Sequence, residues 1–194
     1  NAVILAALDA LDQVEGRSDD ELLRLGVEAA MTAGVTITGA FDDASACFLG
    51  GLCLTDNKQR ELVQRTEVDP ALVALLHIPA QRISKPSISG LDWKSIAPAT
   101  QEAFDLAKRG EWMRALALNG SAVARLLGVS EEPASVAVAA GALTAGITGT
   151  GPATAAVCDA RAAKSVERAL KKLKTGAVAR ANLTNAQAEV VRRP

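Results

Sequence analysis

Apolar side chains recur at helical spacing over five stretches of the chain, and each stretch predicts an amphipathic helix. These are residues 1–11, 18–34, 92–128, 130–141 and 162–174. The second stretch opens with Ser18 and has Glu21 three residues later, which is the arrangement of a capping box at a helix N-terminus. Gly110 interrupts the third stretch, so we expect two or three helices there rather than one.

Apolar and β-branched runs between these helices predict strands. The clearest is residues 72–78, a run that ends before Pro79 and fits a strand buried on both faces. Residues 154–158 and 177–183 predict two further strands, and residues 44–54 a short helix followed by a strand. Residues 145–151 are expected to form a loop. Helices mixed with a small sheet in this order indicate the α+β class.

The composition excludes several classes of protein. The 194 residues include 21 basic and 22 acidic side chains, a net charge of −1, which is not the basic balance of a nucleic-acid-binding protein. Aromatic residues make up 3% of the chain, so stacking surfaces for single-stranded nucleic acid are not expected. Three cysteines without CxxC spacing and one histidine argue against a disulfide framework or a structural zinc site, and suit a cytoplasmic protein.

One long stretch of the chain, residues 134–158, carries no charge. Its residues are mostly Ala, Gly and Thr, and Pro152 lies within it, so it is too weakly apolar and too interrupted for a membrane-spanning helix. We expect a buried helix, a loop and a buried strand instead, and no membrane partner.

The first candidate site is residues 146–153, which read GITGTGPA. Glycines let the backbone turn tightly and approach an anion, and exposed N–H groups then form a concave phosphate site, to which Thr148 and Thr150 add hydroxyl donors. The alternative is a glycine-rich turn between two buried elements. The segment is not a Walker A loop, because no Lys followed by Ser or Thr comes after it, and it lacks the third glycine of a dinucleotide fingerprint.

The second candidate is the adjacent pair Asp42 and Asp43, which follows a short β-branched segment and Gly39. Repulsion between neighbouring carboxylates makes one of them a better proton acceptor, which suits a general base. Adjacent acids also suit a metal ion or the hydroxyl groups of a substrate. The alternative is a solvated turn or a helix N-terminus, where the helix dipole favours acidic residues.

Other reactive side chains have structural explanations that outweigh chemical ones. His77 lies inside an apolar strand and is expected in the core or at the sheet edge, and the lysines of residues 171–174 suit a helix C-terminus. Ser45 and Cys47 have no base close to them in the sequence, so a covalent nucleophile is not indicated.

Together, the two candidate segments resemble motifs of the GHMP small-molecule kinases. Residues 148–153, TGTGPA, resemble the third motif of that superfamily, and residues 39–44, GAFDDA, resemble its segment with the catalytic aspartate in mevalonate kinase. The longer string at residues 36–46, TITGAFDDASA, with TDN at residues 55–57, is most similar to the archaeal-type shikimate kinases of the superfamily.

The resemblance implies a two-domain GHMP kinase fold of the α+β class. Residues 1–68 would form the remaining part of an N-terminal, ATP-binding domain, and residues 69–194 a ferredoxin-like C-terminal domain. The implied reaction uses ATP and Mg²⁺ to phosphorylate the 3-hydroxyl of shikimate, a step toward chorismate and aromatic amino acids. Catalysis of this kind rests on positioning and on stabilising the charge of the moving phosphoryl group.

The resemblance also implies roles for named residues. Asp42, or Asp43 one residue later, would accept the proton of the substrate hydroxyl or orient that hydroxyl. Near the phosphate end, bracing the nucleotide loop, would lie Thr148, Gly149, Thr150 and Gly151. Thr38 and Gly39 would bind the substrate. No protein-ligated metal is assigned.

In the resemblance, the family's N-terminal strands and its Ser-rich nucleotide loop would precede Asn1, and residues 1–11 would continue the helix that begins in that loop. We therefore expect these 194 residues alone to be inactive, to expose apolar surface, and to need the N-terminal segment or a chain carrying it as a partner. Two alternatives remain open. One is another GHMP kinase that acts on homoserine or a mevalonate-type alcohol, and the other is a non-catalytic α+β interaction module.

Overall fold

The computed structural model describes residues 16–34, 36, 39–81, 83, 88 and 90–188. The helix predicted over residues 1–11 lies outside this part of the chain. Two compact units make up the chain: unit 1 combines Asn1–Val68 with Thr184–Pro194, and unit 2 is Asp69–Leu183. The boundaries expected from the sequence, 1–68 and 69–194, differ from this division in the last segment, which returns to unit 1.

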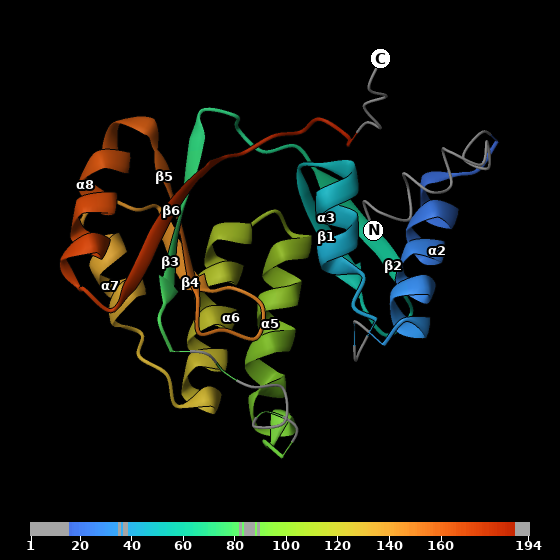
Figure 1. Cartoon of the computed structure of the whole chain (residues 1–194), viewed down its shortest axis with the longest axis horizontal. Coiled ribbons are helices and arrows are strands. Elements are labelled where there is room, and N and C mark those ends of the chain that lie inside the picture. The colour runs from blue at the N-terminus through green and yellow to red at the C-terminus, as the bar shows by residue number, and fades with distance from the viewer. Residues whose placement is uncertain are drawn as a thin grey trace. The chain divides into compact units, whose positions relative to one another are not determined.

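The described residues of unit 1 form two helices and a two-stranded antiparallel sheet (Figure 1). Its described elements are α2 (Asp19–Thr32), α3 (Asp42–Leu49), β1 (Leu52–Asp56) and β2 (Glu61–Thr66). Its buried core is formed by Leu22, Leu23, Val27, Phe41, Ala44, Phe48 and Leu49. The helix followed by a strand predicted over residues 44–54 is confirmed as α3 and β1. The sequence does not predict β2, because its residues are mostly polar and become a strand by pairing with β1.

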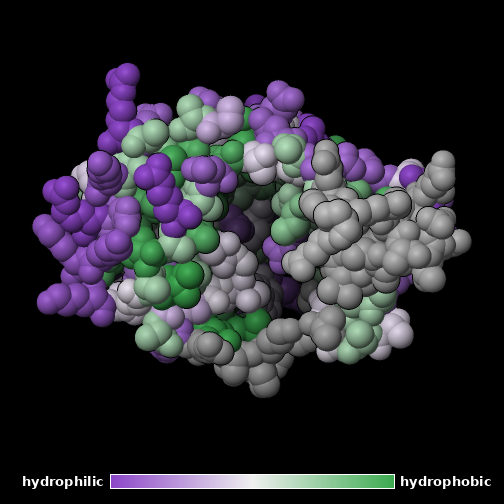
Figure 2. All heavy atoms as spheres, turned by 45° about the horizontal axis from the view of Figure 1, so that its top comes forward, coloured by the Kyte–Doolittle hydropathy of each residue, from purple (hydrophilic) through white to green (hydrophobic). Residues whose placement is uncertain are grey.

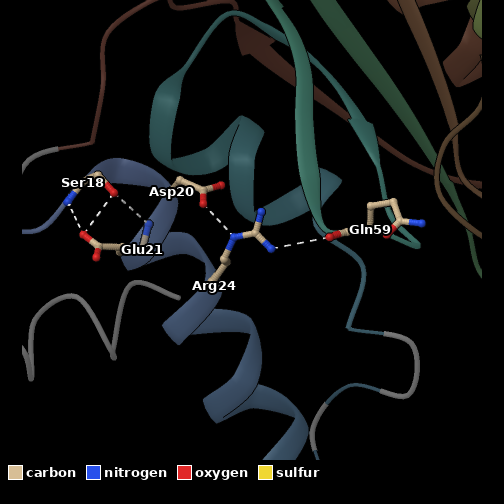
Figure 3. A network of polar contacts seen from close by, with 5 residues as sticks. All are labelled: Ser18, Asp20, Glu21, Arg24 and Gln59. Atoms are coloured by element: carbon tan, nitrogen blue, oxygen red, sulfur yellow. Dashed lines mark hydrogen bonds and ion pairs between the residues drawn. The ribbon is translucent and has the colours of Figure 1, made fainter.

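The predicted start of α2 is confirmed in detail. The Ser18 hydroxyl accepts a hydrogen bond from the Glu21 N–H at 3.3 Å, and a Glu21 carboxylate oxygen accepts one from the Ser18 N–H at 2.7 Å (Figure 3). This reciprocal pair satisfies N–H groups that a helix start otherwise leaves without partners. The hydrogen bonds from the Ser18 backbone and hydroxyl also lower the pKa of Glu21.

Unit 2 has a ferredoxin-like topology. In chain order its described elements are β3 (Leu72–Pro79), η1 (Trp93–Ile96), α5 (Ala97–Lys108), α6 (Trp112–Leu127), α7 (Glu132–Ala139), β4 (Thr144–Ile147), β5 (Thr154–Asp159), α8 (Ala160–Lys172) and β6 (Gly176–Asn182). The four strands are ordered β4-β5-β3-β6, and all neighbours are antiparallel (Figure 1). Strands joined by helices, then by a hairpin, then by a helix again give the β-α-β-β-α-β arrangement of that fold. The α+β class and the ferredoxin-like C-terminal domain are therefore confirmed.

The expectation of a loop over residues 145–151 is wrong in its first half. Residues Thr144–Ile147 form β4, whose four residues are all buried, and only the residues after Ile147 turn back toward β5. The sequence masks this strand because Ala145 and Gly146 carry little or no side chain and have low strand propensity. Pairing with β5 and packing under α6 make it a strand.

The contact between α6 and β4 depends on two glycines. A Cβ atom added to Gly120 would lie 2.6 Å from the Cα of Gly146 and 2.7 Å from the backbone nitrogen of Ile147. A Cβ atom added to Gly146 would lie 2.5 Å from the backbone oxygen of Leu116. Helix and strand backbones therefore approach each other at a distance that leaves no room for any side chain at either position.

Helix α8 is amphipathic, as predicted. Ala163, Val166 and Leu170 are buried against the unit 2 sheet core. Figure 2 shows hydrophilic side chains gathered at the left, where α8 lies in Figure 1. The exposed charged residues of this helix are Arg161, Lys164, Arg168, Lys171 and Lys172.

The charge-free stretch 134–158 lies in α7, β4, β5 and their connections, as expected for buried elements. Within the described part of the chain, no helix has the length and apolar character needed to cross a bilayer.

Candidate functional site

Asp42 is the first residue of α3, and the preceding Phe41 occupies the N-cap position. The Phe41 ring is completely buried, whereas Asp42 and Asp43 are both exposed. The core therefore anchors the residue immediately before the carboxylates, and the carboxylates themselves face solvent. The acidic pair therefore lies at a helix N-terminus, which was one of the two interpretations of its sequence. Such a position does not exclude chemistry, because an exposed, anchored carboxylate can accept a proton or a hydrogen bond from a ligand.

The side chain of Asn57, in the turn after β1, contacts the N-terminus of α3. Its Oδ1 accepts hydrogen bonds from the backbone N–H groups of Phe41 (2.9 Å) and Asp42 (3.1 Å) and from the Thr55 hydroxyl (3.0 Å). Its Nδ2 donates to Oδ1 of Asp42 at 3.2 Å. Among the described residues Asp43 has no comparable contact. Asn57 thus caps the helix and holds the Asp42 side chain. The sequence marks this residue only through the TDN string at residues 55–57, which does not indicate the role.

The turn that carries Asn57 is itself held in place. Oδ1 of Asp56 accepts hydrogen bonds from the N–H groups of Lys58 (2.9 Å) and Gln59 (3.0 Å). Arg24 of α2 donates to the Gln59 carbonyl oxygen at 3.5 Å and to Asp20 at 2.6 Å (Figure 3). Helix α2 is thereby linked to the turn between β1 and β2.

The C-terminal end of α3 is held by Arg65 of β2. Its guanidinium donates to the backbone oxygens of Leu49 (3.0 Å), Gly50 (3.1 Å) and Asn185 (2.7 Å). Gly50 has a φ of +66°, and a Cβ atom there would collide with the backbone oxygen of Ala186. The glycines that follow the acidic segment therefore admit the returning C-terminal segment.

Backbone conformation and packing both require a glycine at position 39. It is buried, has a φ of +60°, and a Cβ atom there would lie 2.6 Å from Sδ of Met31. Its N–H donates to the Thr36 hydroxyl at 3.3 Å. Thr38, the other residue expected at the substrate, lies outside the described residues.

The glycine-rich segment forms the hairpin turn between β4 and β5. The Thr148 N–H donates to the Ala153 oxygen at 2.9 Å, and the Gly151 N–H donates to the Thr148 oxygen at 3.1 Å. Thr148, Gly149 and Thr150 are exposed, and Gly149 has a φ of +58° with open space where a Cβ atom would lie. The turn is thus closed at its base and open at its tip, where backbone N–H and hydroxyl groups can meet an anion.

A cavity of about 600 Å³ adjoins this hairpin within unit 2. Pro152 contributes to its wall, together with apolar side chains that include Leu91 and Leu127. His77 and Thr175 also line it and bond to each other, with 3.0 Å between His77 Nε2 and the Thr175 hydroxyl. His77 is only 1% exposed, and burial lowers its pKa. It is a buried core residue, as the sequence suggests, rather than an accessible base.

The structure thus places Asp42 and Asp43 in unit 1 and Thr148–Gly151 in unit 2. In the described part of the chain, no three His, Cys, Asp or Glu side chains lie together as a metal site requires. Proteins usually hold Mg²⁺ with one or two carboxylates together with substrate phosphates and water, so a nucleotide would supply most of the ligands of such an ion.

Comparison with known proteins places this geometry in a family. Residues 97–175 match the family described as GHMP kinases C terminal. The chain is 47% identical over 139 residues to a shikimate kinase of Pyrococcus furiosus, an alignment that covers 72% of this chain and 50% of that protein. It is 38% identical over 190 residues to a shikimate kinase of Methanothrix thermoacetophila, covering 98% of this chain and 64% of that protein.

Solved structures show the same fold. A homoserine kinase from Cytophaga hutchinsonii matches 93% of this chain and 62% of its own, with a TM-score of 0.68 and 21% identity. The L. major mevalonate kinase in complex with R-mevalonate matches 96% of this chain and 65% of its own, with a TM-score of 0.63 and 17% identity. The chain spans about half to two thirds of the length of the relatives it matches. The family match, the relatives and the shared fold agree, and this chain belongs to the GHMP kinase family.

Proposed function

We propose that the protein containing this chain transfers a phosphoryl group from ATP to the 3-hydroxyl of shikimate, giving shikimate 3-phosphate. The similarity to archaeal proteins named shikimate kinase, at 38% identity over 98% of the chain and 47% over 72%, carries this proposal. The fold alone would not select the substrate, because structures titled homoserine kinase and mevalonate kinase share it.

In this proposal Asp42 accepts the proton of the attacking hydroxyl or orients that hydroxyl. Its support is the geometry of α3: Asp42 is exposed, its backbone is anchored next to the buried Phe41, and its Oδ1 is held by Asn57. Asp43 is exposed as well and remains the second choice for this role. A carboxylate held in one orientation favours proton transfer because less motion has to be arrested in the transition state.

The hairpin of unit 2 is proposed to lie at the phosphate end of the substrates. Thr148 and Thr150 offer hydroxyl donors, and the positive φ of Gly149 and Gly151 gives a backbone that a phosphate can approach closely. Gly39, with Thr38, is proposed to lie on the shikimate side. Residues 1–68 would then be the remaining ATP-binding part and residues 69–194 the C-terminal domain, with the difference that Thr184–Pro194 is grouped with unit 1.

The test is ADP release with shikimate, homoserine and mevalonate as separate acceptors. It uses the 194-residue chain and a second form joined to the portion of the Pyrococcus furiosus relative that has no counterpart here. We expect shikimate-dependent ADP release from the joined form and none from the chain alone. Asp42→Asn should abolish turnover in the joined form while its thermal unfolding stays unchanged.

The other outcomes distinguish the alternatives. Turnover with homoserine or mevalonate but not shikimate would keep the family and overturn the substrate. If the joined form is folded but releases no ADP with any of the three alcohols, a non-catalytic α+β module would be favoured. Full turnover in Asp42→Asn together with loss in Asp43→Asn would move the role one residue along the chain.

A further inference from the structure

We propose that Asn57 is a positioning residue that sets the orientation of the Asp42 carboxylate. The inference deepens the proposed function and rests on it in one respect, namely that Asp42 acts on the substrate hydroxyl. Asn57 follows Asp42 by 15 residues in the sequence and lies in the turn between β1 and β2.

The orientation of the Asn57 carboxamide is determined by its neighbours. Two backbone N–H groups, of Phe41 and Asp42, point at its oxygen. An N–H group cannot accept a hydrogen bond, so a flipped amide would place its own NH₂ group against two donors. The oxygen therefore faces the helix N-terminus, and the NH₂ group faces the acceptor that is present, Oδ1 of Asp42.

This arrangement links the cap to the carboxylate. Because the Asn57 oxygen satisfies the first N–H groups of α3, the amide cannot rotate without leaving these donors without that partner. The NH₂ group consequently holds Oδ1 of Asp42 and leaves Oδ2 to meet a ligand. Asp43 follows one residue later, about 100° around the helix, and Asn57 makes its carboxylate hydrogen bond to Asp42 and not to Asp43.

Elements behind the turn hold Asn57 in place. Asp56 closes the turn through its bonds to the N–H groups of Lys58 and Gln59. Arg24 ties the Gln59 carbonyl oxygen to α2 (Figure 3). Its guanidinium also lies 5.9 Å from the centre of the Phe41 ring. The same arginine thus contacts the turn that carries Asn57 and the residue that Asn57 caps.

The first test needs no catalytic activity. The NMR signals of the Asn57 side-chain amide are followed in the full chain as the solution is acidified through the carboxyl range. Asp56, the residue next to Asn57, carries a second carboxyl group, so every protein compared also carries Asp56→Asn, which keeps an oxygen for the N–H groups of Lys58 and Gln59. In that background we expect the signals to move with Asp42 present and in Asp43→Asn, and to move far less in Asp42→Asn, because Asp42 receives the amide proton. A movement in Asp42→Asn as large as with Asp42 present, or its loss in Asp43→Asn, would overturn the assignment.

The second test measures kcat and KM in the joined form described above. Asn57→Asp keeps an oxygen for the two N–H groups but replaces the amide donor by a second carboxylate. We expect a loss of about 100-fold in kcat with a smaller change in KM, and an acid limb of the kcat profile displaced to higher pH. Gln59→Ala is the matched control in the same turn, since Gln59 contributes only its backbone, and it should leave kcat unchanged.

The two tests separate failure of the inference from failure of the proposed function. A wild type that phosphorylates no alcohol would refute the function, and the amide signals would still decide whether Asn57 holds Asp42. Wild-type kcat in Asn57→Asp, in a protein whose turnover requires Asp42, would refute the positioning role alone. Thermal unfolding of every variant shows whether a loss of turnover comes from loss of the fold.

Discussion

Helix α3 of unit 1 begins with the acidic pair, and strand β4 of unit 2 leads into the glycine-rich turn. The two elements are held in place in different ways. Polar side chains from outside the helix fix α3: Asn57 at its N-terminus and Arg65 at its C-terminus. Close approach of backbones fixes β4, where Gly120 and Gly146 leave no room for a side chain. A methyl group added between α6 and β4 should therefore destabilise unit 2, and loss of polar groups around α3 should destabilise unit 1.

The largest effect is expected at the close contact between α6 and β4. Gly120→Ala places a methyl group 2.6 Å from the Gly146 Cα, and backbone atoms on both sides must shift to admit it. We expect the free energy of unfolding of the chain to fall by about 3 kcal/mol, measured by urea denaturation. Gly90→Ala is the control, because a Cβ atom there meets nothing within 4 Å. Equal free energies of unfolding for the two variants would show that the close contact between α6 and β4 does not limit the stability of unit 2.

A polar deletion in unit 1 should have the next largest effect. The Asn185 side chain accepts from the Val68 N–H at 2.9 Å and donates to the Val68 oxygen at 2.8 Å. Asn185→Ala leaves both partly buried backbone groups without this partner, and should lower the free energy of unfolding by about 2 kcal/mol. Gln187→Ala removes one exposed contact, to Asp19, and should change the stability much less. If Asn185→Ala and Gln187→Ala both unfold at the same urea concentration as the wild type, the polar contacts of Asn185 do not stabilise unit 1.

His77 sharpens the comparison, because it is a titratable side chain buried in unit 2. Burial lowers its pKa from the ordinary value of 6.5, so the unfolded chain takes up a proton at a higher pH than the folded chain does. Stability should be full above pH 6.5 and decline below it, by at most about 1.4 kcal/mol per pH unit until the folded-state pKa is passed. Urea denaturation at pH 7.5 and 5.5 should show this decline in the wild type and a weaker one in His77→Gln. The same pH dependence in both proteins would exclude His77 as the cause.

The smallest of these effects is expected at an exposed polar cap of unit 1. Ser18→Ala removes the hydroxyl that accepts the Glu21 N–H, and should lower the free energy of unfolding by about 1 kcal/mol. Ser18→Asp retains an acceptor at the cap and should restore most of the loss. Measured by thermal unfolding, an alanine variant as stable as the wild type would show that α2 depends on its buried face alone.

Residues that carry strong local signals were predictable. The start of α2 at Ser18, the end of α6 at Gly128 and the strand over Leu72–Pro79 follow from capping, left-handed glycine and a continuous apolar run. The acidic pair and the glycine-rich turn were identified as candidate chemistry from residue types and spacing alone. Each of these signals lies within a few consecutive residues.

The elements that escaped prediction depend on partners distant in the chain. Strand β4 has small side chains and becomes a strand because β5 pairs with it and α6 covers it. Strand β2 is polar and exists through its pairing with β1. Asn57 belongs to the TDN string that carries the resemblance, but only the fold brings its carboxamide to the start of α3.

The sequence by itself determined the α+β class, most helix boundaries, the candidate acidic and glycine-rich segments, and their resemblance to GHMP kinases. These properties rest on local hydrogen bonding, residue conformational preference and hydrophobic periodicity. Only the tertiary structure decided which side chain holds Asp42, why Gly50 must lack a Cβ atom, and that the last segment returns to unit 1. The physical reason is that these contacts join groups separated by 15 to 136 residues, and hydrogen-bond geometry and steric exclusion act only after folding has brought such groups together.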